Sequence, residues 1–140
     1  MAVHERSHTT SASPERVWAI WSDTATWPSW NPDVRSITLD GPFSSGTTGT
    51  MTTGNGTHKI RLENVVSGRS FDLVTSPIPA TTFRFHCEIN WEAAGSRISQ
   101  GVSMSGLLAP IMSPMMGNRI ASSFEGILAG LANAAESSNG

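Results

Sequence analysis

Residues 12–32 contain the pattern that most restricts the fold of this 140-residue chain. Ser13 is followed by Pro14, and this pair is typical of a helix start. The serine side chain can accept a hydrogen bond from a free backbone N–H, and proline suits the first helical position because it has no N–H to satisfy. A short helix is therefore predicted over residues 14–22. Its apolar content is Val17, Trp18, Ile20 and Trp21.

A tryptophan- and proline-rich turn follows this helix. A second helical turn is expected within residues 24–30, and it must end at Asn31 because Pro32 forces the residue before it out of helical geometry. Trp27 and Trp30 flank the turn. We interpret them as apolar plugs that fix the turn, with stacking on a ligand as the alternative.

From residue 34 to residue 106 the sequence alternates between short strand-like segments and turn residues. Short connections of this kind favour antiparallel pairing of consecutive strands. Residues 3–11 alternate enough to form one more strand ahead of the first helix. The strands predicted after the helices cover residues 34–40, 47–53, 57–66, 69–76, 81–92 and 96–105.

The C-terminal part of the chain predicts one long helix. Ser113 and Pro114 repeat the helix-start signal, and the helix is expected over residues 114–136. Gly126 and Gly130 lie beside its apolar face, where glycine is tolerated if the sheet or a ligand approaches closely; simple tight packing is the favoured alternative. The apolar face recurs at helical spacing and comprises Met116, Ile120, Phe124, Ile127, Leu128, Leu131 and Ala135.

This order of elements resembles the START-like superfamily (SRPBCC), also called the polyketide cyclase/dehydrase and lipid-transport superfamily. The resemblance is most specific over residues 12–32, and the order of elements extends it over nearly the whole chain. It implies an α+β helix-grip fold in a single domain, residues 1–140. In this fold a curved antiparallel sheet of about seven strands wraps around the long C-terminal helix, two short helices follow the first strand, and a ligand cavity lies between sheet and helix.

The composition argues against several classes of function. Charged residues make up 14% of the chain, the net charge is −2, and Lys59 is the only lysine, so the basic surface of a nucleic-acid-binding protein is missing. The single cysteine, Cys87, excludes an internal disulfide and a Cys-pair metal site. The sequence has no metal-binding, phosphate-loop or dinucleotide motif, so we expect neither a metal nor a cofactor.

The sequence also carries expectations about location. No apolar run approaches the ~20 residues of a membrane-spanning helix, so stable membrane insertion is not expected. Residues 1–11 lack the apolar centre of a signal peptide. A cytoplasmic protein is therefore expected.

Strand periodicity assigns side chains to the two faces of the sheet. The helix-facing side chains of the strand over 81–92 are Phe83, Phe85, Cys87, Ile89 and Trp91. Those of the strand over 96–105 are Ile98, Gln100, Val102 and Met104. In the strand over 57–66, His58 and Asn64 share a face with Ile60 and Leu62, although His58 is expected at the surface because it starts the strand.

The sheet and the helix together predict the lining of the cavity. Cys87 is interpreted as a small buried apolar residue rather than as a nucleophile. For Gln100, the alternative to ligand contact is a buried amide hydrogen-bonded to backbone. For Arg119, the alternative is a side chain that extends into solvent. The predicted ligand-binding residues on these elements are Phe83, Phe85, Cys87, Gln100, Met104, Met116, Arg119, Ile120 and Phe124.

The first strand is unusual for the superfamily that the chain resembles. In the register implied by the resemblance, its inward face carries Arg6, His8 and Thr10, where an apolar residue is usual. A buried arginine needs partners, and a polar cavity that takes an anionic or oxygen-rich ligand would supply them. Arg6 and His8 are therefore added to the predicted ligand-binding residues. The alternative is an edge strand whose face is half solvated.

Three functions are compatible with these patterns. The first is binding, with transport as a further role, of a small and largely apolar ligand such as a lipid, a polyketide or an aromatic metabolite. The second is a polyketide cyclase, aromatase or dehydrase, in which His8 would act as the general acid/base and Arg6 would polarise a carbonyl. These two residues are weak catalytic candidates, and we commit to no catalytic residue.

The third function is a protein-interaction module. It predicts an exposed apolar patch around residues 107–116 and a small or filled cavity. The methionine-rich junction ahead of the last helix bears on this function, because flexible thioethers suit adaptable apolar surfaces. Its side chains are expected at the cavity mouth, with ordinary core packing or a homodimer contact as alternatives. They are Met104, Met112, Met115 and Met116.

Overall fold

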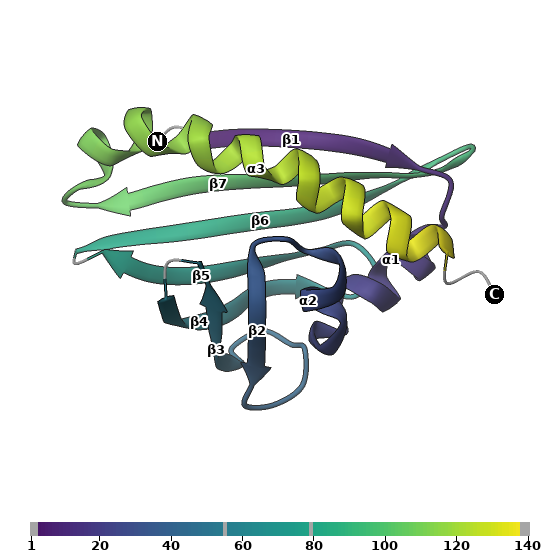
Figure 1. The fold of residues 1–140 in the computed structure, drawn as a ribbon, viewed down its shortest axis with the longest axis horizontal. Helices are drawn as coiled ribbons and strands as arrows, with labels where there is room; N and C mark the ends of the chain where they lie inside the picture. The colour runs from purple at the N-terminus through teal and green to yellow at the C-terminus, as the bar shows by residue number, and fades with distance from the viewer. Residues whose placement is uncertain (1–2, 55, 79, 138–140) are drawn as a thin grey trace.

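A computed structural model describes residues 3–54, 56–78 and 80–137, without the side chains of residues 3, 77–78 and 112–115. These residues form seven strands, three α-helices and one 3₁₀ turn. Figure 1 shows how the elements are arranged. In chain order they are β1 (Val3–Thr10), α1 (Pro14–Trp21), η1 (Thr24–Thr26), α2 (Trp27–Trp30), β2 (Val34–Leu39), β3 (Thr48–Thr53), β4 (Gly56–Val66), β5 (Ser70–Ile78), β6 (Thr81–Glu92), β7 (Gly95–Gly106) and α3 (Ala109–Ser137).

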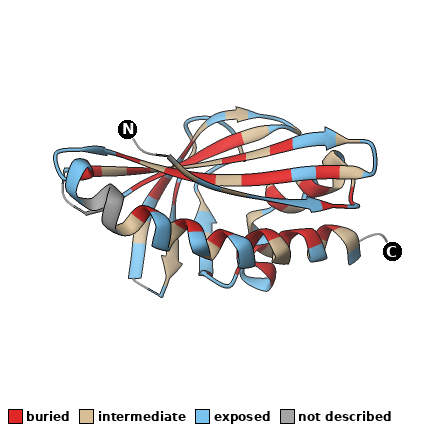
Figure 2. Cartoon of the chain, turned by 90° about the horizontal axis from the view of Figure 1, so that it is seen from above, coloured by how far each residue is buried: buried red, intermediate tan, exposed pale blue. Residues whose placement is uncertain are grey.

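The seven strands form one antiparallel sheet in the order β1-β7-β6-β5-β4-β3-β2. Helix α3 packs along β1 and β7, and it also touches α1 and α2 (Figure 1). Buried and exposed residues alternate along α3, as expected for a helix with one face on the sheet (Figure 2). The predicted α+β helix-grip fold is confirmed, including the two short helices after the first strand.

Local signals explain the N-terminal helices. The Ser13 hydroxyl accepts a hydrogen bond from the Arg16 backbone N–H at 3.3 Å, and Pro14 occupies the first helical turn. Helix α2 ends at Trp30, and its C-cap residue Asn31 is extended (φ −102°, ψ 109°) ahead of Pro32. Both features agree with the sequence prediction.

Helix α3 begins at Ala109, ahead of the predicted start near residue 114. Pro110 lies in its first turn. The backbone N–H groups of that turn have no partner inside the helix, so the N–H that proline lacks removes no helical hydrogen bond. The proline therefore permits the earlier start. The predicted boundary, based on Ser113 and Pro114 as the start signal, was wrong.

An aromatic cluster closes the end of the molecule at α1 and α2. Phe71 of β5 is almost fully buried and is surrounded by the rings of Trp18, Trp21, Trp27 and Phe43, with centroids 4.9–6.4 Å away. The indole N–H of Trp27 donates to the Trp21 carbonyl at 2.9 Å, so its polar group is satisfied. The tryptophans thus hold the turn between α1 and β2 in place.

The two helical glycines of α3 differ in their surroundings. A Cβ on Gly130 would lie 2.0 Å from the carbonyl oxygen of Trp30, so α2 and α3 meet there at backbone distance. A Cβ on Gly126 would meet no atom within 4 Å. Tight packing, the favoured alternative, therefore explains Gly130 but not Gly126.

Two face assignments of the sequence analysis were wrong. Trp91 is 76% exposed rather than packed against the helix, because it lies beside the β6–β7 turn, beyond the covered part of the sheet. Asn64 has a positive φ of 51° at a bulge in the β4–β5 pairing. The bulge turns its side chain to the outer face, where Nδ2 donates to Asp72 at 2.9 Å.

Candidate functional site

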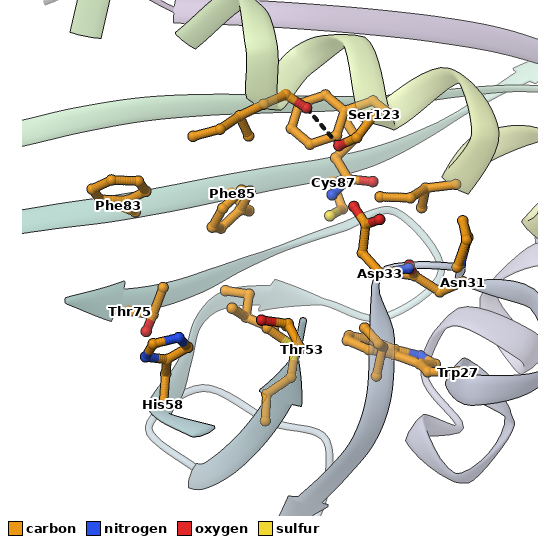
Figure 3. A pocket seen from close by; sticks show the side chains of 18 of the residues that line it. Trp27, Asn31, Asp33, Thr53, His58, Thr75, Phe83, Phe85, Cys87 and Ser123 are labelled. Carbon is orange, nitrogen blue, oxygen red and sulfur yellow. Dashed lines mark hydrogen bonds between the residues drawn. The ribbon is translucent and has the colours of Figure 1, made fainter. Parts of the chain in front are cut away.

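A cavity of about 890 Å³ lies between α3 and the inner face of the sheet, and the α1–α2 turn closes one side of it. Its apolar walls come from several elements: Phe83 and Phe85 from β6, Phe71 and Leu73 from β5, and Ile120 and Phe124 from α3. Figure 3 shows Phe83, Phe85 and Cys87 spaced along β6, with Ser123 of α3 near Cys87 and Trp27, Thr53 and His58 across the cavity. The volume and the mostly apolar lining are those of a small-molecule site.

Most of the predicted lining residues are found in this cavity. They are Phe83, Phe85, Cys87, Gln100, Met116, Arg119, Ile120 and Phe124. Met104 faces α3 as predicted, but it is 1% exposed and packs with Phe83 and Ala109 in a separate cluster. It is not among the described residues that line the cavity. The predicted positions of Met112 and Met115 lie outside the described side chains.

The β1 face that carries Arg6 and His8 lies against α3 but outside the cavity. Arg6 pairs with Gln100 and His8 with Ile98, so these side chains point to the helix side, as the resemblance implied. Arg6 Nε lies 3.7 Å from Glu125 Oε2, and His8 is exposed. Neither residue is among the described residues that line the cavity.

The position of α3 explains this placement. The helix runs over β1 and β7 instead of over the centre of the sheet, so its polar flank faces the edge strand. Thr10 Oγ1 donates to Glu136 at 2.5 Å, and His4 Nδ1 lies 3.2 Å from Asn118 Oδ1. The polar residues of β1 therefore contact polar residues of the helix. This arrangement corresponds to the alternative interpretation, an edge strand whose face is half solvated.

The cavity also contains polar residues that the sequence analysis missed. Those from β3, β4 and β5 are Thr53, His58 and Thr75. For His58 the signal was present, since it alternates with the buried Ile60 and Leu62 on one face of β4. The segment after α2 supplies Asn31, Asp33 and Arg35, and no periodicity marks them because they come from a turn and a strand start.

Charged and uncharged polar groups occupy different parts of the lining. Asp33, Arg35 and Arg119 are all exposed, so the charges of the lining remain in contact with solvent. Cys87 is buried, and Gln100 is half-buried. Burial, and to a lesser degree the negative charge of Asp72, raises the pKa of the Cys87 thiol well above its ordinary value, so the thiol is neutral.

The Gln100 side chain is the notable polar group of the interior. Its Oε1 is buried and accepts no hydrogen bond among the described residues. At this oxygen, the structure therefore does not show the hydrogen bond to backbone that the alternative interpretation predicted. Gln100 lies opposite Cys87 in the β6–β7 pairing, and both side chains line the cavity.

A second polar cluster occupies the outer face of the sheet and is not part of the cavity. Arg84 joins Asp72 and Glu63 through contacts of 2.8 Å each. His86 Nδ1 lies 2.5 Å from Asp72 Oδ1, and Nε2 lies 3.1 Å from Glu88 Oε1.

Within the described part of the chain, no group of three or more His, Cys, Asp or Glu side chains has an arrangement that could hold a metal ion.

The comparisons with known proteins agree with this architecture. Residues 1–136 match the family described as polyketide cyclase / dehydrase and lipid transport. The chain belongs to this family. As a class, proteins of this family bind hydrophobic molecules, so membership implies a small hydrophobic ligand in general terms. No curated protein matches the sequence.

Solved structures share the fold of this family member at low sequence identity. A START superfamily protein from Mycobacterium smegmatis has a TM-score of 0.77 at 13% identity, over 98% of this chain and 99% of that one. XoxI from Bacillus cereus has a TM-score of 0.77 at 19% identity, over 100% and 99%. Ara h 8.0201 has a TM-score of 0.69 at 15% identity, over 97% and 98%.

In the described residues, none of the helices has the length and hydrophobicity that crossing a membrane requires.

Proposed function

We propose that this protein binds, and in that way carries, a small and largely apolar ligand such as a lipid, a polyketide or an aromatic metabolite. The observation that supports this most is the 890 Å³ cavity between α3 and the sheet. Aromatic and aliphatic side chains form its walls, and the charged side chains of its lining are exposed. A ligand with an apolar body and a polar end fits this distribution of groups.

An enzymatic function has less support. Arg6 and His8, the two residues that carried the cyclase hypothesis, lie outside the cavity. The general acid/base role of His8 requires a substrate within hydrogen-bond reach, and its position beside α3 does not offer one in this cavity. We therefore propose no reaction for the protein.

One observation favours the interaction module as a second candidate. Leu107, Leu108 and Ile111 are exposed at the start of α3, with Leu107 at 82%. This patch lies where that hypothesis predicted it, but the hypothesis also required a small or filled cavity. The volume of the cavity favours ligand binding as the principal function, and a cytoplasmic location and a homodimer remain predictions.

A pair of tryptophan substitutions on α3 tests the proposal. Ile120→Trp adds a large side chain inside the cavity, and Ile111→Trp adds the same side chain at an exposed position of the same helix. We expect wild type and Ile111→Trp to bind the apolar dye anilinonaphthalene sulfonate with similar affinity. Ile120→Trp should bind it at least tenfold more weakly, since its side chain occupies the binding volume.

The comparison depends on both variants being folded, which circular dichroism and thermal unfolding would establish. Equal dye binding by the wild type and both variants would contradict the proposal. Loss of binding in Ile111→Trp alone would favour the exposed patch, and with it the interaction module.

A further inference from the structure

The two arginines of the described cavity lining, Arg35 and Arg119, have no partner within the protein. Among the residues that the structure describes, neither guanidinium makes a hydrogen bond or an ion pair. Arginines elsewhere on the sheet contact a carboxylate or a hydroxyl group; they are Arg6, Arg61, Arg84 and Arg97. The donors of the two lining arginines are therefore available to a ligand.

A β-bulge brings Arg35 to the cavity. In the β2–β3 pairing, Val34 lies opposite Thr53 and Ser36 opposite Thr52, so Arg35 is an extra residue in β2. Consecutive residues of a regular strand point to opposite faces, but Val34 and Arg35 both line the cavity. Bulges often redirect a side chain next to a functional site. The irregularity of β2 thus places a cationic group where a ligand can reach it.

The charges of the lining are unbalanced. Two arginines face one aspartate, Asp33, so the described lining sums to +1 with His58 counted as neutral, whereas the whole chain has a net charge of −2. The excess of positive charge is therefore a local property of the cavity and not a general property of the chain. A cleft lined by one sign of charge attracts ligands of the opposite sign.

Burial determines where an anionic group can lie. Arg35 and Arg119 are exposed, so an anion that pairs with them keeps part of its hydration. Phe83, Phe124 and Cys87 are buried, and an anion beside them would lose its water without gaining a charged partner. The anionic end of a ligand therefore belongs at the two arginines, and its apolar body belongs between the buried side chains.

We propose that the ligand is an amphipathic carboxylate whose anionic end binds Arg35 and Arg119 while its apolar body fills the cavity. The planar guanidinium group matches the geometry of a carboxylate and can bind both of its oxygens. This inference rests on the proposed function and specifies the class of its ligand. Asp33 opposes the binding of the carboxylate and limits the affinity that the two arginines provide.

Two matched probes test the requirement for a carboxylate. 4-Butylbenzoate is anionic at neutral pH, and 4-butylbenzamide has the same ring and chain without the charge. Their dissociation constants follow from displacement of N-phenyl-1-naphthylamine, an uncharged dye that forms no ion pair with arginine. We expect the wild type to bind the benzoate about fivefold more tightly at low ionic strength, because exposed ion pairs contribute an amount equivalent to roughly this ratio. High salt should reduce the preference.

Substitution of the arginines assigns the preference to them. Arg35→Gln should reduce it to about twofold, because one of the two cations is lost. The double variant Arg35→Gln/Arg119→Gln leaves Asp33 as the remaining full charge of the described lining, so it should bind the benzamide more tightly than the benzoate. Arg97→Gln is the matched control, because it removes the same charge from an exposed residue outside the described lining. It should retain the preference of the wild type.

The outcomes separate this inference from the proposed function. Equal binding of the two probes by the wild type would overturn the inference and leave cavity binding intact. A preference for the benzoate that persists in the double variant, or that falls equally in Arg97→Gln and Arg35→Gln, would also overturn it. If the wild type bound neither the dye nor the probes, the proposed function itself would fail.

Discussion

Arg6 and Gln100 lie directly opposite each other in the β1–β7 ladder and on the same face of the sheet, but of the two only Gln100 lines the cavity. Helix α3 packs over these two strands, and the polar flank of the helix takes up Arg6 through Glu125. A cross-strand pair is thus divided between two environments. This division separates the binding site from the polar residues of the edge strand.

The first prediction is that the polar β1 residues do not contribute to ligand binding. Arg6→Ala and His8→Ala should each leave the dissociation constant of anilinonaphthalene sulfonate within about twofold of wild type, since neither side chain lines the cavity. Fluorescence titration measures this. A tenfold loss in either variant would place β1 in the site after all.

The second prediction concerns the aromatic pair of the cavity wall. Phe124 is 1% exposed, so Phe124→Ala should lower the free energy of unfolding by about 3–5 kcal/mol. Phe85→Ala should cost less because Phe85 is only half-buried. The edge-to-face contact predicts a coupling of about 0.5–1.5 kcal/mol in a double-mutant cycle measured by urea unfolding. Strict additivity would show that the rings do not interact.

The third prediction uses the two helical glycines as a matched pair. Gly126→Ala should raise the free energy of unfolding by roughly 1 kcal/mol, because alanine favours the helix and the site has space. Gly130→Ala should lower it by about 1–3 kcal/mol, because the added Cβ meets the backbone of Trp30. Urea unfolding of both variants checks the opposite signs. Stabilisation by both would mean that α2 and α3 are not in close contact.

The fourth prediction concerns the pH dependence of stability. Burial lowers the pKa of His86, but its hydrogen bonds to Asp72 and Glu88 outweigh the burial, so the pKa is raised above its ordinary value of 6.5. A group with a raised pKa in the folded state stabilises the protein below its unfolded pKa, and this contribution is lost as the pH rises through the folded pKa. His86 should therefore make the protein less stable at alkaline pH.

The side chain of His86 is 44% exposed, so solvent screens the contribution. We expect the contribution of His86 to the free energy of unfolding to fall by about 0.5 kcal/mol between pH 6 and pH 9, in line with half-exposed ion pairs. His86→Gln should lack this part of the decrease. The same decrease in both proteins would exclude His86 as its source.

The elements of the fold were predictable because their signals are local, and their arrangement followed from the resemblance to the START-like superfamily. Ser13 and Pro14 define a helix start by their chemistry, and alternation along β6 identifies Phe83, Phe85 and Cys87 as inward-facing. The start of α3 was misplaced because a proline inside the first turn is compatible with helix, so Pro110 gave no boundary.

The candidate site was only partly predictable, since alternation assigns a face but not a neighbour. It placed Arg6 on the same face as Gln100 without showing that α3 covers the edge of the sheet. Trp91 was misassigned for a related reason, because alternation does not indicate where the covered part of a strand ends. Asp33 and Arg35 reach the cavity from a turn and a strand start, and their positions depend on tertiary structure.

The central claim is that a small molecule binds inside the cavity, and a titration of isotope-labelled protein with 4-butylphenol, followed by backbone amide chemical shifts, tests it most directly. The account predicts that the largest shift changes occur at Cys87, Gln100 and Ser123, which line the cavity. Changes confined to Leu107, Leu108 and Ile111, at the exposed start of α3, would contradict it.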